Sequence, residues 1–432
     1  MQKFPLPLQL YKTVIRFLRV RPWLVLLLLT IASIGIVFTR NPDAFLLPQF
    51  WAEDGKYWYA DAYNHGVLRS LFMDYVGSLQ LFTRFIGSLS IFLPLSLAPL
   101  FFMLVAVAVQ ILPVILINTK RFSSLIPRTW VRLLICFCYL GIPNSFEVHA
   151  NLTNANWHLA LVACMVLVGP LAKQKAWKLF DYPVLLFAGL TGPFAVVLAA
   201  IAWIRWYTLS PADRKEYRMH AWIVSACALV QLVVLLLAPA SDRLTRGLGA
   251  SPGGLLSIIG VRLGAASMLG MNYINTIPFV QLLGHGYWLV AAYMLGVLLY
   301  ALWKAPLALK LFILFTWGIF AAALIKPQAS QLFPQWEALI MGAGNRYFFL
   351  PMLSWIVASF WLVGHIRSRY LSYIFVAPIV LLITLGIPRD WGYTPLPDLH
   401  FSDYVQKFEA APSHQHVCMP INPDWVMCLD KR

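Results

Sequence analysis

The sequence predicts an all-α polytopic membrane protein, and its composition, its recurring apolar segments and the positions of its basic residues all support this fold class. Of its 432 residues, 60% are hydrophobic and 12% are charged, whereas a soluble domain is about half apolar and about a quarter charged. Apolar segments that approach the roughly 20 residues of a membrane-spanning helix recur from residue 23 to residue 387. A water-soluble globular fold is therefore excluded.

The apolar segments correspond to about eleven membrane passes. A pair of short helices is expected on either side of a break at Leu190-Thr191-Gly192-Pro193-Phe194, because Pro and Gly interrupt a helix and neighbouring protein can cover irregular backbone at membrane depth. In order, the predicted passes are 23–38, 97–118, 130–143, 157–172, the pair across 182–206, 220–240, 287–303, 306–325, 348–365 and 371–387.

The basic residues predict the orientation of these passes. The formal charge of +16 does not indicate a nucleic-acid partner, because Lys and Arg lie in short clusters between apolar segments. The positive-inside rule then places the N-terminus inside and the C-terminus outside. No small-x-small cleavage site follows the first span, so we expect a retained signal anchor. The clusters are Lys12, Arg16, Arg19 and Arg21; Lys120, Arg121 and Arg128; Lys173, Lys175 and Lys178; Arg205, Arg214, Lys215 and Arg218; Lys304; and Arg367 and Arg369.

Residues 1–387 are expected to form the transmembrane domain, and residues 388–432 a small extracytoplasmic tail. Within the first outer loop, 39–96, the segment Val67–Ser90 has apolar residues at helical spacing, which suits helices on the membrane interface. A second outer segment is expected at 241–286. All the densest polar chemistry lies in these outer segments or in the shorter outer loops.

The tail contains two short apolar runs around a Pro/Asn/Asp turn, a pattern typical of a hairpin. This hairpin would bring Cys418 and Cys428 together on an oxidising side of the membrane, where disulfides persist. We therefore predict a disulfide between them. The remaining cysteines fall inside apolar spans and are interpreted as small core residues: Cys136, Cys138, Cys164 and Cys227.

The stretch Trp51-Ala52-Glu53-Asp54-Gly55 directly follows the first span in a chain with only 17 acidic residues. An unpaired charge near hydrocarbon is unfavourable, so the two carboxylates are solvated, paired or used in chemistry. One interpretation is a helix cap or an ion pair with Lys56 or Arg40. The other is catalysis, because adjacent acids perturb each other and one can act as a base near neutral pH. The neighbouring aromatic residues suit either an interface belt or a sugar platform; Trp58 is the candidate for sugar contact.

Two further polar clusters lie in outer loops. Glu147 and His149 are candidate acceptor-binding or sugar-binding residues at the mouth of two short spans. Together with His158 they could supply ligands for a divalent metal ion. Their spacing in the sequence matches neither the HxH nor the HxxxH pattern of metal sites, so we expect no metal site. The neighbouring Asn151 and Asn154 are interpreted as caps in a hydrated loop.

The second cluster is Gly342-Ala343-Gly344-Asn345-Arg346-Tyr347. An interfacial Arg can simply extend to lipid headgroups. A Gly-rich turn followed by Arg also suits a phosphate, because backbone N–H groups approach the anion and guanidinium supplies a bidentate fork. Arg346 is therefore the candidate for binding a phosphate, with Arg84 and Arg262 as weaker candidates. Tyr347 is a candidate for sugar contact.

The acid pair, the spans broken into short pieces, the Leu190–Phe194 break, the Asn345-Arg346-Tyr347 turn and the outer tail together resemble the GT-C superfamily of polyprenyl-phosphate-sugar glycosyltransferases. The resemblance covers most of the chain in layout and only short motifs in sequence. It implies a bacterial inner-membrane enzyme whose active site faces the periplasm or exterior. The tail is too short for the large soluble domain of oligosaccharyltransferases, which argues against protein glycosylation.

The resemblance implies that Glu53 or Asp54 removes a proton from an acceptor hydroxyl, while Arg346, with Arg84, stabilises the departing lipid phosphate. The expected partners are membrane lipid, a polyprenyl-phosphate sugar and a polysaccharide or glycolipid acceptor such as O-antigen, with no nucleic acid. No cofactor beyond the lipid-linked donor is expected. A lipid-linked saccharide flippase or other transporter, and a noncatalytic subunit of a polysaccharide assembly system, remain as alternatives.

Overall fold

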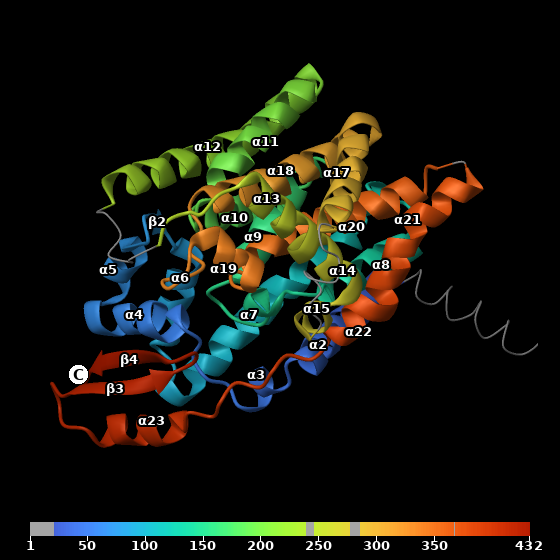
Figure 1. Cartoon of the computed structure of the whole chain (residues 1–432). Helices are drawn as coiled ribbons and strands as arrows, with labels where there is room; N and C mark the ends of the chain where they lie inside the picture. Colours follow the sequence, from blue (N-terminus) through green and yellow to red (C-terminus); the bar gives the residue numbers. More distant parts are fainter. Residues whose placement is uncertain (1–20, 239–245, 277–285, 367) are drawn as a thin grey trace, which may run out of the picture.

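The computed structural model describes residues 21–238, 246–276, 286–366 and 368–432, which are predominantly helical (Figure 1). Of the predicted basic residues, Lys12, Arg16, Arg19 and Arg367 lie outside these ranges. The described residues contain eight helices that are long and apolar enough to cross a membrane: Pro22–Arg40, Leu95–Ile117, Pro211–Leu237, Pro252–Leu269, Tyr287–Lys304, Leu307–Ile325, Arg346–Val363 and Ser372–Arg389. Three shorter apolar helices accompany them: Thr129–Leu140, Ala155–Val168 and Phe194–Thr208. The predicted class, a helical polytopic membrane chain, agrees with this inventory.

The elements follow one another without a large sheet. In the first half they are α2 (Pro22–Arg40), α3 (Asp43–Leu46), a π-helical turn (Asp54–Tyr59), α4 (Ala60–His65), α5 (Val67–Phe72), β1 (Asp74–Tyr75), β2 (Ser78–Leu79), α6 (Leu81–Ser90), α7 (Ala98–Ile117), α8 (Thr129–Leu140), α9 (Ala155–Val168), α10 (Lys175–Gly189) and α11 (Phe194–Thr208). In the second half they are α12 (Pro211–Leu237), α13 (Pro252–Ser257), a π-helical turn (Ile258–Ala265), α14 (Ala266–Leu269), α15 (Met271–Thr276), α17 (Tyr287–Lys304), α18 (Leu307–Ile325), α19 (Gln335–Met341), α20 (Arg346–Val363), α21 (Arg369–Leu381), a π-helical turn (Leu382–Gly386), α22 (Ile387–Arg389), α23 (Phe401–Ala410), β3 (His416–Ile421) and β4 (Trp425–Asp430).

The predicted break near Gly192 is present, because α10 ends at Gly189 and α11 begins at Phe194. Gly192 has a φ of +80°, a conformation that side chains disfavour. Across this break the chain pairs with the first outer loop: Leu81 N donates to Leu190 O, and Gly192 N donates to Leu79 O, each at 2.9 Å. The break therefore anchors the loop that carries the acid pair.

Two spans differ from the prediction. The span predicted at 220–240 begins earlier, at Pro211, because Ser210 caps the helix by accepting a hydrogen bond from Asp213 N, and Pro is favoured in the first turn. The predicted outer segment 241–286 contains Pro252–Leu269, which is apolar enough to count among the eight spanning candidates. The parts of this segment at 239–245 and 277–285 lie outside the described residues.

The loops between the helices gather at two opposite ends of the bundle. At one end, which we call the site end, Arg40 at the end of α2 donates to Leu140 O at 2.6 Å, to Ile142 O at 3.1 Å and to Asp390 O at 3.1 Å. At the other, which we call the basic end, Arg121 donates to Pro170 O and forms an ion pair with Asp181 at 2.7 Å. These contacts hold together two separate groups of interhelical loops.

A large apolar core lies between these ends, and α9 and α20 are its most enclosed helices. At the site end, α6 packs very closely on the Asp54–Tyr59 turn. A Cβ added to Gly87 would lie 2.1 Å from Trp58 O, a distance that backbone atoms do not tolerate. Only glycine at this position of α6 lets the turn approach so closely, and this contact sets the position of the acid pair.

The tail forms the predicted hairpin, with Cys418 opposite Cys428 in the register of β3 and β4 and a disulfide joining them. The hairpin lies against α4, although the two segments come from opposite ends of the chain (Figure 1). Asn64 Nδ2 donates to Cys428 O, and Asp430 N donates to Asn64 Oδ1, both at 3.0 Å. One asparagine therefore docks the end of the tail on the first outer loop.

We predict that replacing both Cys418 and Cys428 by Ala loosens the tail without preventing membrane insertion. The disulfide closes a short loop, with a sequence separation of 10, so its entropic contribution is at most about 3 kcal/mol. The contacts of Asn64 remain in the variant. Limited proteolysis should cleave the variant's tail faster than that of the wild-type protein, while the amount of protein in the membrane stays the same.

The wild-type protein supplies the matching test of compartment. In intact cells, a membrane-impermeant thiol reagent should label Cys418 and Cys428 only after reduction. Labelling before reduction would exclude the disulfide, and no labelling after reduction would argue against an outer tail.

Candidate active site

The turn that carries the acid pair is held from two sides. The C-terminal tail supports its start, because Ala52 N donates to Asn422 O in the bend between β3 and β4. Asp54 N then donates to Trp51 O at 2.7 Å, which begins the π-helical turn. Gly55 leaves room for Ile421 of β3, since a Cβ there would lie 2.9 Å from Ile421 Cδ1. The tail and the first outer loop therefore fix the acid pair together.

Asp54 is almost fully enclosed, with an exposed fraction of 3%. Its Oδ1 accepts hydrogen bonds from Thr153 N at 2.8 Å and from Thr153 Oγ1 at 2.6 Å, and its Oδ2 accepts one from Leu152 N at 3.2 Å. Burial raises the pKa of Asp54 to about 7, although the hydrogen bonds favour the ionised form. Asp54 thus fastens the loop before α9 and titrates near neutral pH.

Glu53 has a more open position. It is half-buried, and its Oε1 accepts a hydrogen bond from the hydroxyl of Tyr75 at 2.9 Å. Its negative charge also acts on Arg346, which is 293 residues further along the chain. The two acids therefore differ in kind: Asp54 faces inward to backbone amides, and Glu53 faces the arginine turn.

Arg346 and Glu147 form an ion pair at this surface. Arg346 Nη1 lies 2.9 Å from Glu147 Oε2, and Arg346 N donates to the same oxygen at 3.1 Å. The two side chains keep exposed fractions of 25% and 22%. Arg346 Nη2 donates to Gln328 O and to the hydroxyl of Tyr347. The predicted grouping of Glu147 and Arg346 with the acid pair is therefore present in space, but the guanidinium already binds a carboxylate.

Arg262 lies behind the same turn and is fully buried. Its Nη2 donates to Asn345 Oδ1 at 2.7 Å and to Asn144 Oδ1 at 3.1 Å, while its Nε has no hydrogen-bond partner among the described residues. The positive charge of Arg262 also acts on Glu147. Arg262 thus adds positive potential beneath the Gly342–Arg346 turn without reaching the surface.

Arg84 occupies a different place from the one predicted. It forms an ion pair with Asp61 at 2.9 Å, and its guanidinium lies 5.1 Å from the ring centroid of Trp58. Trp58 has an exposed fraction of only 1%, and its Nε1 donates to Thr153 Oγ1 at 3.0 Å. In this conformation Arg84 pairs with Asp61 and does not face the predicted phosphate position. Trp58 is a core residue that a sugar cannot reach.

His149 and Tyr347 also have structural partners. His149 Nε2 lies 3.1 Å from Val37 O, and Nδ1 lies 3.2 Å from Gln110 Nε2. Burial lowers the pKa of His149 well below its ordinary value, so the ring is neutral and donates to the Val37 carbonyl. Tyr347 is buried, and its hydroxyl accepts from Gln328 N. His149 therefore supports the loop instead of facing a ligand.

Sequence reasoning missed a small cleft beside the acid pair, with a volume of about 70 Å³. Trp51 and Phe146, whose rings contact edge to face, form one wall. The polar residues around it come from three separate segments, so no local motif indicates them; their only signal is that each lies in an expected outer segment or loop. They are Asn41, Asp43, Gln49, His149, Asn151 and Asn422.

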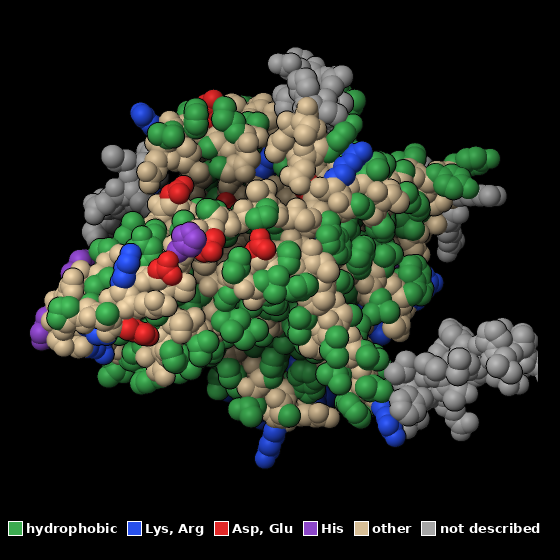
Figure 2. Space-filling view, turned by 90° about the horizontal axis from the view of Figure 1, so that it is seen from below, with side chains coloured by type: hydrophobic (Ala, Val, Ile, Leu, Met, Phe, Trp, Pro, Cys, Tyr) green, Lys and Arg blue, Asp and Glu red, His purple; other side chains and the backbone are tan. Residues whose placement is uncertain are grey.

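The acidic side chains visible on the face shown in Figure 2 lie mostly left of its centre, whereas most Lys and Arg side chains lie toward its margins. Among the described residues, the group with metal-ligand geometry is His416, Cys418 and Cys428 in the tail. Its two sulfur atoms are joined in the disulfide, which removes them as thiolate ligands. His158 does not join Glu147, because its ring nitrogens face Tyr139 and Val148 O, each at 2.7 Å.

Comparison of the chain with protein-family models, with curated proteins and with solved structures returned no match.

The buried carboxyl group of Asp54 predicts a pH-dependent stability. Its pKa is about 7 in the folded protein and near 3.8 in the unfolded chain. The folded state therefore binds the proton more tightly, and this contribution is fully present below the unfolded pKa and is lost as pH rises through about 7. We expect the wild-type protein to lose on the order of a few kcal/mol more than Asp54→Asn between pH 5 and pH 8. Unfolding midpoints measured over this pH range test the difference, and parallel curves for the two proteins would contradict it.

Proposed function

We propose that this chain is a GT-C-like glycosyltransferase that moves a sugar from a polyprenyl-phosphate donor to an extracytoplasmic acceptor, such as a cell-surface polysaccharide. The observation that carries the proposal is the convergence of Glu53, Glu147 and Arg346, from three distant segments, on one end of a helical membrane bundle. A proton acceptor and a guanidinium at a membrane surface are the two groups that direct displacement from a lipid phosphate requires.

The proposal includes eleven passes, made of α2, α7, α8, α9, α10, α11, α12, α17, α18, α20 and α21, with the N-terminus inside. On this assignment the segment Pro252–Leu269 does not cross the membrane. Both of its ends support this, because Gly254 lies beside Trp336 and Gly270 lies beside Asp390, and both partners belong to the site end. The site end would then face the periplasm or exterior of a bacterial inner membrane, and the basic end the cytoplasm.

In the proposed reaction, the carboxylate of Glu53 accepts the proton of an acceptor hydroxyl. The acceptor oxygen then forms a bond with the anomeric carbon of the donor sugar. The bond from that carbon to the phosphate oxygen breaks, and the oxygen keeps the electron pair. Glu53 is the better base of the acid pair, because its side chain is partly exposed, whereas Asp54 is almost fully buried against the Leu152–Thr153 backbone.

Arg346 would receive the leaving phosphate. Its ion pair with Glu147 is partly exposed, so a phosphate can reach Nη1 and displace the carboxylate, while Nη2 stays fixed by Gln328 O. Arg262 adds a second positive charge behind the turn. The small cleft lined by Trp51 and Phe146 lies next to the acid pair. It is too small to enclose a sugar ring, but its aromatic wall suits contact with one apolar face of an acceptor sugar.

We predict that Glu53→Gln lowers glycosyl transfer by at least about 100-fold, the lower range for removal of a general base. The assay measures transfer of labelled hexose from a panel of polyprenyl-phosphate hexoses to purified surface polysaccharide. Asp74→Asn is the matched control, because Asp74 is an exposed acid of the same outer segment, and it should keep full activity. Full activity of Glu53→Gln would refute this role. Absence of transfer by the wild-type protein with every donor would refute the function.

We predict that Arg346→Lys raises the KM for the donor by roughly tenfold and leaves the KM for the acceptor unchanged, because Lys keeps the charge but not the fork. Steady-state kinetics with each substrate varied in turn separate the two constants. Arg218→Lys, an exposed substitution in α12, is the control. Equal effects on both substrates would reduce Arg346 to a structural anchor of the turn.

A further inference from the structure

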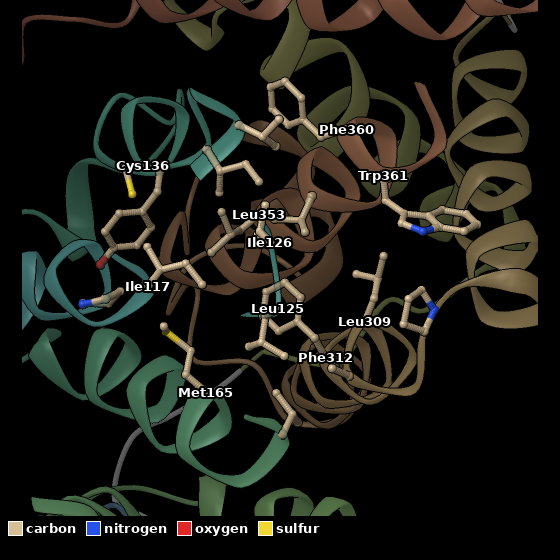
Figure 3. Close-up of a pocket in the computed structure, with 18 of the residues that line it drawn as sticks. Ile117, Leu125, Ile126, Cys136, Met165, Leu309, Phe312, Leu353, Phe360 and Trp361 are labelled. Atoms are coloured by element: carbon tan, nitrogen blue, oxygen red, sulfur yellow. The ribbon is translucent and has the colours of Figure 1, made fainter. Parts of the chain in front are cut away.

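A large apolar cavity lies far from the acid pair. It has a volume of about 610 Å³ and lies between α7, α8, α9, α18 and α20. Figure 3 shows aliphatic and aromatic side chains from several helices around it, among them Ile117, Leu125, Met165, Phe312, Leu353 and Phe360. An apolar cavity of about 150 Å³ can bind benzene, so this cavity has room for a much longer hydrocarbon.

The cavity belongs to the basic end of the bundle. Ile117 is the last residue of α7, Arg128 immediately precedes α8, and His365 follows the end of α20. All three line the cavity, and Arg128 and His365 are exposed, so the cavity reaches the surface there. Three of the surrounding helices, α7, α18 and α20, are long and apolar enough to cross a membrane, so this opening would lie at one leaflet.

A layer of rings separates the cavity from the candidate active site. Tyr139 lines the cavity, its hydroxyl lies 2.7 Å from His158 Nδ1, and Phe349 packs against both rings. Along α20, Arg346 and His365 are 19 residues apart, which corresponds to about 28 Å at 1.5 Å per residue. A phosphate bound at one position is therefore out of reach of the other, so a head group at Arg128 is distinct from the phosphate of the proposed donor.

The rim of the cavity carries a positive charge that the described residues do not neutralise. The neighbouring arginines are occupied: Arg121 pairs with Asp181, and Arg132 donates to Ile126 O and Asn118 Oδ1. The guanidinium of Arg128, in contrast, has no ion pair or hydrogen bond within the described part of the chain. An apolar chamber with an available guanidinium at its mouth matches a molecule with a hydrocarbon chain and an anionic head.

We infer that this cavity binds one acyl chain of an anionic phospholipid from the leaflet at the basic end, with the lipid phosphate on Arg128. The inference does not depend on the proposed glycosyl transfer, because it involves neither the acid pair nor Arg346. The site would hold a resident lipid between α8, α18 and α20 and would make the stability of the protein depend on the headgroup composition of that leaflet.

The test is native mass spectrometry of the full-length protein with dioleoyl phosphatidylglycerol and dioleoyl phosphatidylcholine. The wild-type protein should bind phosphatidylglycerol at least tenfold more tightly. Arg128→Gln should abolish the preference, and Ala308→Phe, which fills the cavity, should weaken phosphatidylglycerol binding tenfold. Leu299→Phe, on the exposed face of α17, is the matched control and should leave binding unchanged. Equal binding of both lipids by the wild-type protein, or unchanged binding by folded Ala308→Phe, would overturn the inference.

Two further measurements cover the remaining outcomes. Glycerol phosphate alone should raise the unfolding temperature of the protein less than phosphatidylglycerol does. If both raise it equally, the lipid headgroup binds without its acyl chain, and the inference is wrong. If Ala308→Phe fails to fold, photo-crosslinking of the wild-type protein with phosphatidylglycerol that carries a diazirine in its acyl chain replaces it. Crosslinks on the cavity-lining residues of α8 and α20 support the site, and crosslinks confined to other helices exclude it.

Discussion

The site end of this protein depends on the need to satisfy backbone polar groups where helices end in apolar surroundings. Sheet hydrogen bonds satisfy few of these backbone groups, because each of the two sheets in the described residues has only two strands. Single buried side chains satisfy them instead. Arg40 binds four carbonyl groups from two loops, and the carboxylate of Asp390 accepts from Asn144 N, Met271 N and Asn272 N. These two buried charges join the first span, the loop after α8 and the end of the last span.

Asp54 follows the same rule, and this explains why the acid pair is asymmetric. Its carboxylate satisfies the backbone of Leu152 and Thr153 just before α9, so it must turn inward. The adjacent Glu53 then points the other way, toward Tyr75 and the arginine turn. The same two-residue sequence therefore produces one carboxylate that binds backbone amides and one that accepts from Tyr75 and acts on Arg346. Local geometry assigns the two roles, and no difference in side-chain chemistry is needed.

Hydropathy was sufficient to predict the helical membrane class and most helix positions, since burial in lipid acts on each segment separately. The tail hairpin was predictable for a similar reason, because its two strands are neighbours in sequence. The proximity of Glu53 to Arg346 and the ion pair of Arg84 with Asp61 were not predictable, because both depend on tertiary packing. The prediction for Trp58 was based on residue type alone, because aromatic side chains often contact sugars. The close approach of α6 buries Trp58, and this packing is not visible in the sequence.

The docking of the tail has a consequence for the order in which the protein matures. Asn422 supports Ala52, and Asn64 binds the strand that ends at Asp430, so a segment that is synthesised late completes a turn that is synthesised early. The acid pair is synthesised early but gains this support only when residues 422–430 have been made and have folded against it. A chain that stops after its last span would carry every catalytic candidate and still lack the part that holds the acidic turn in place.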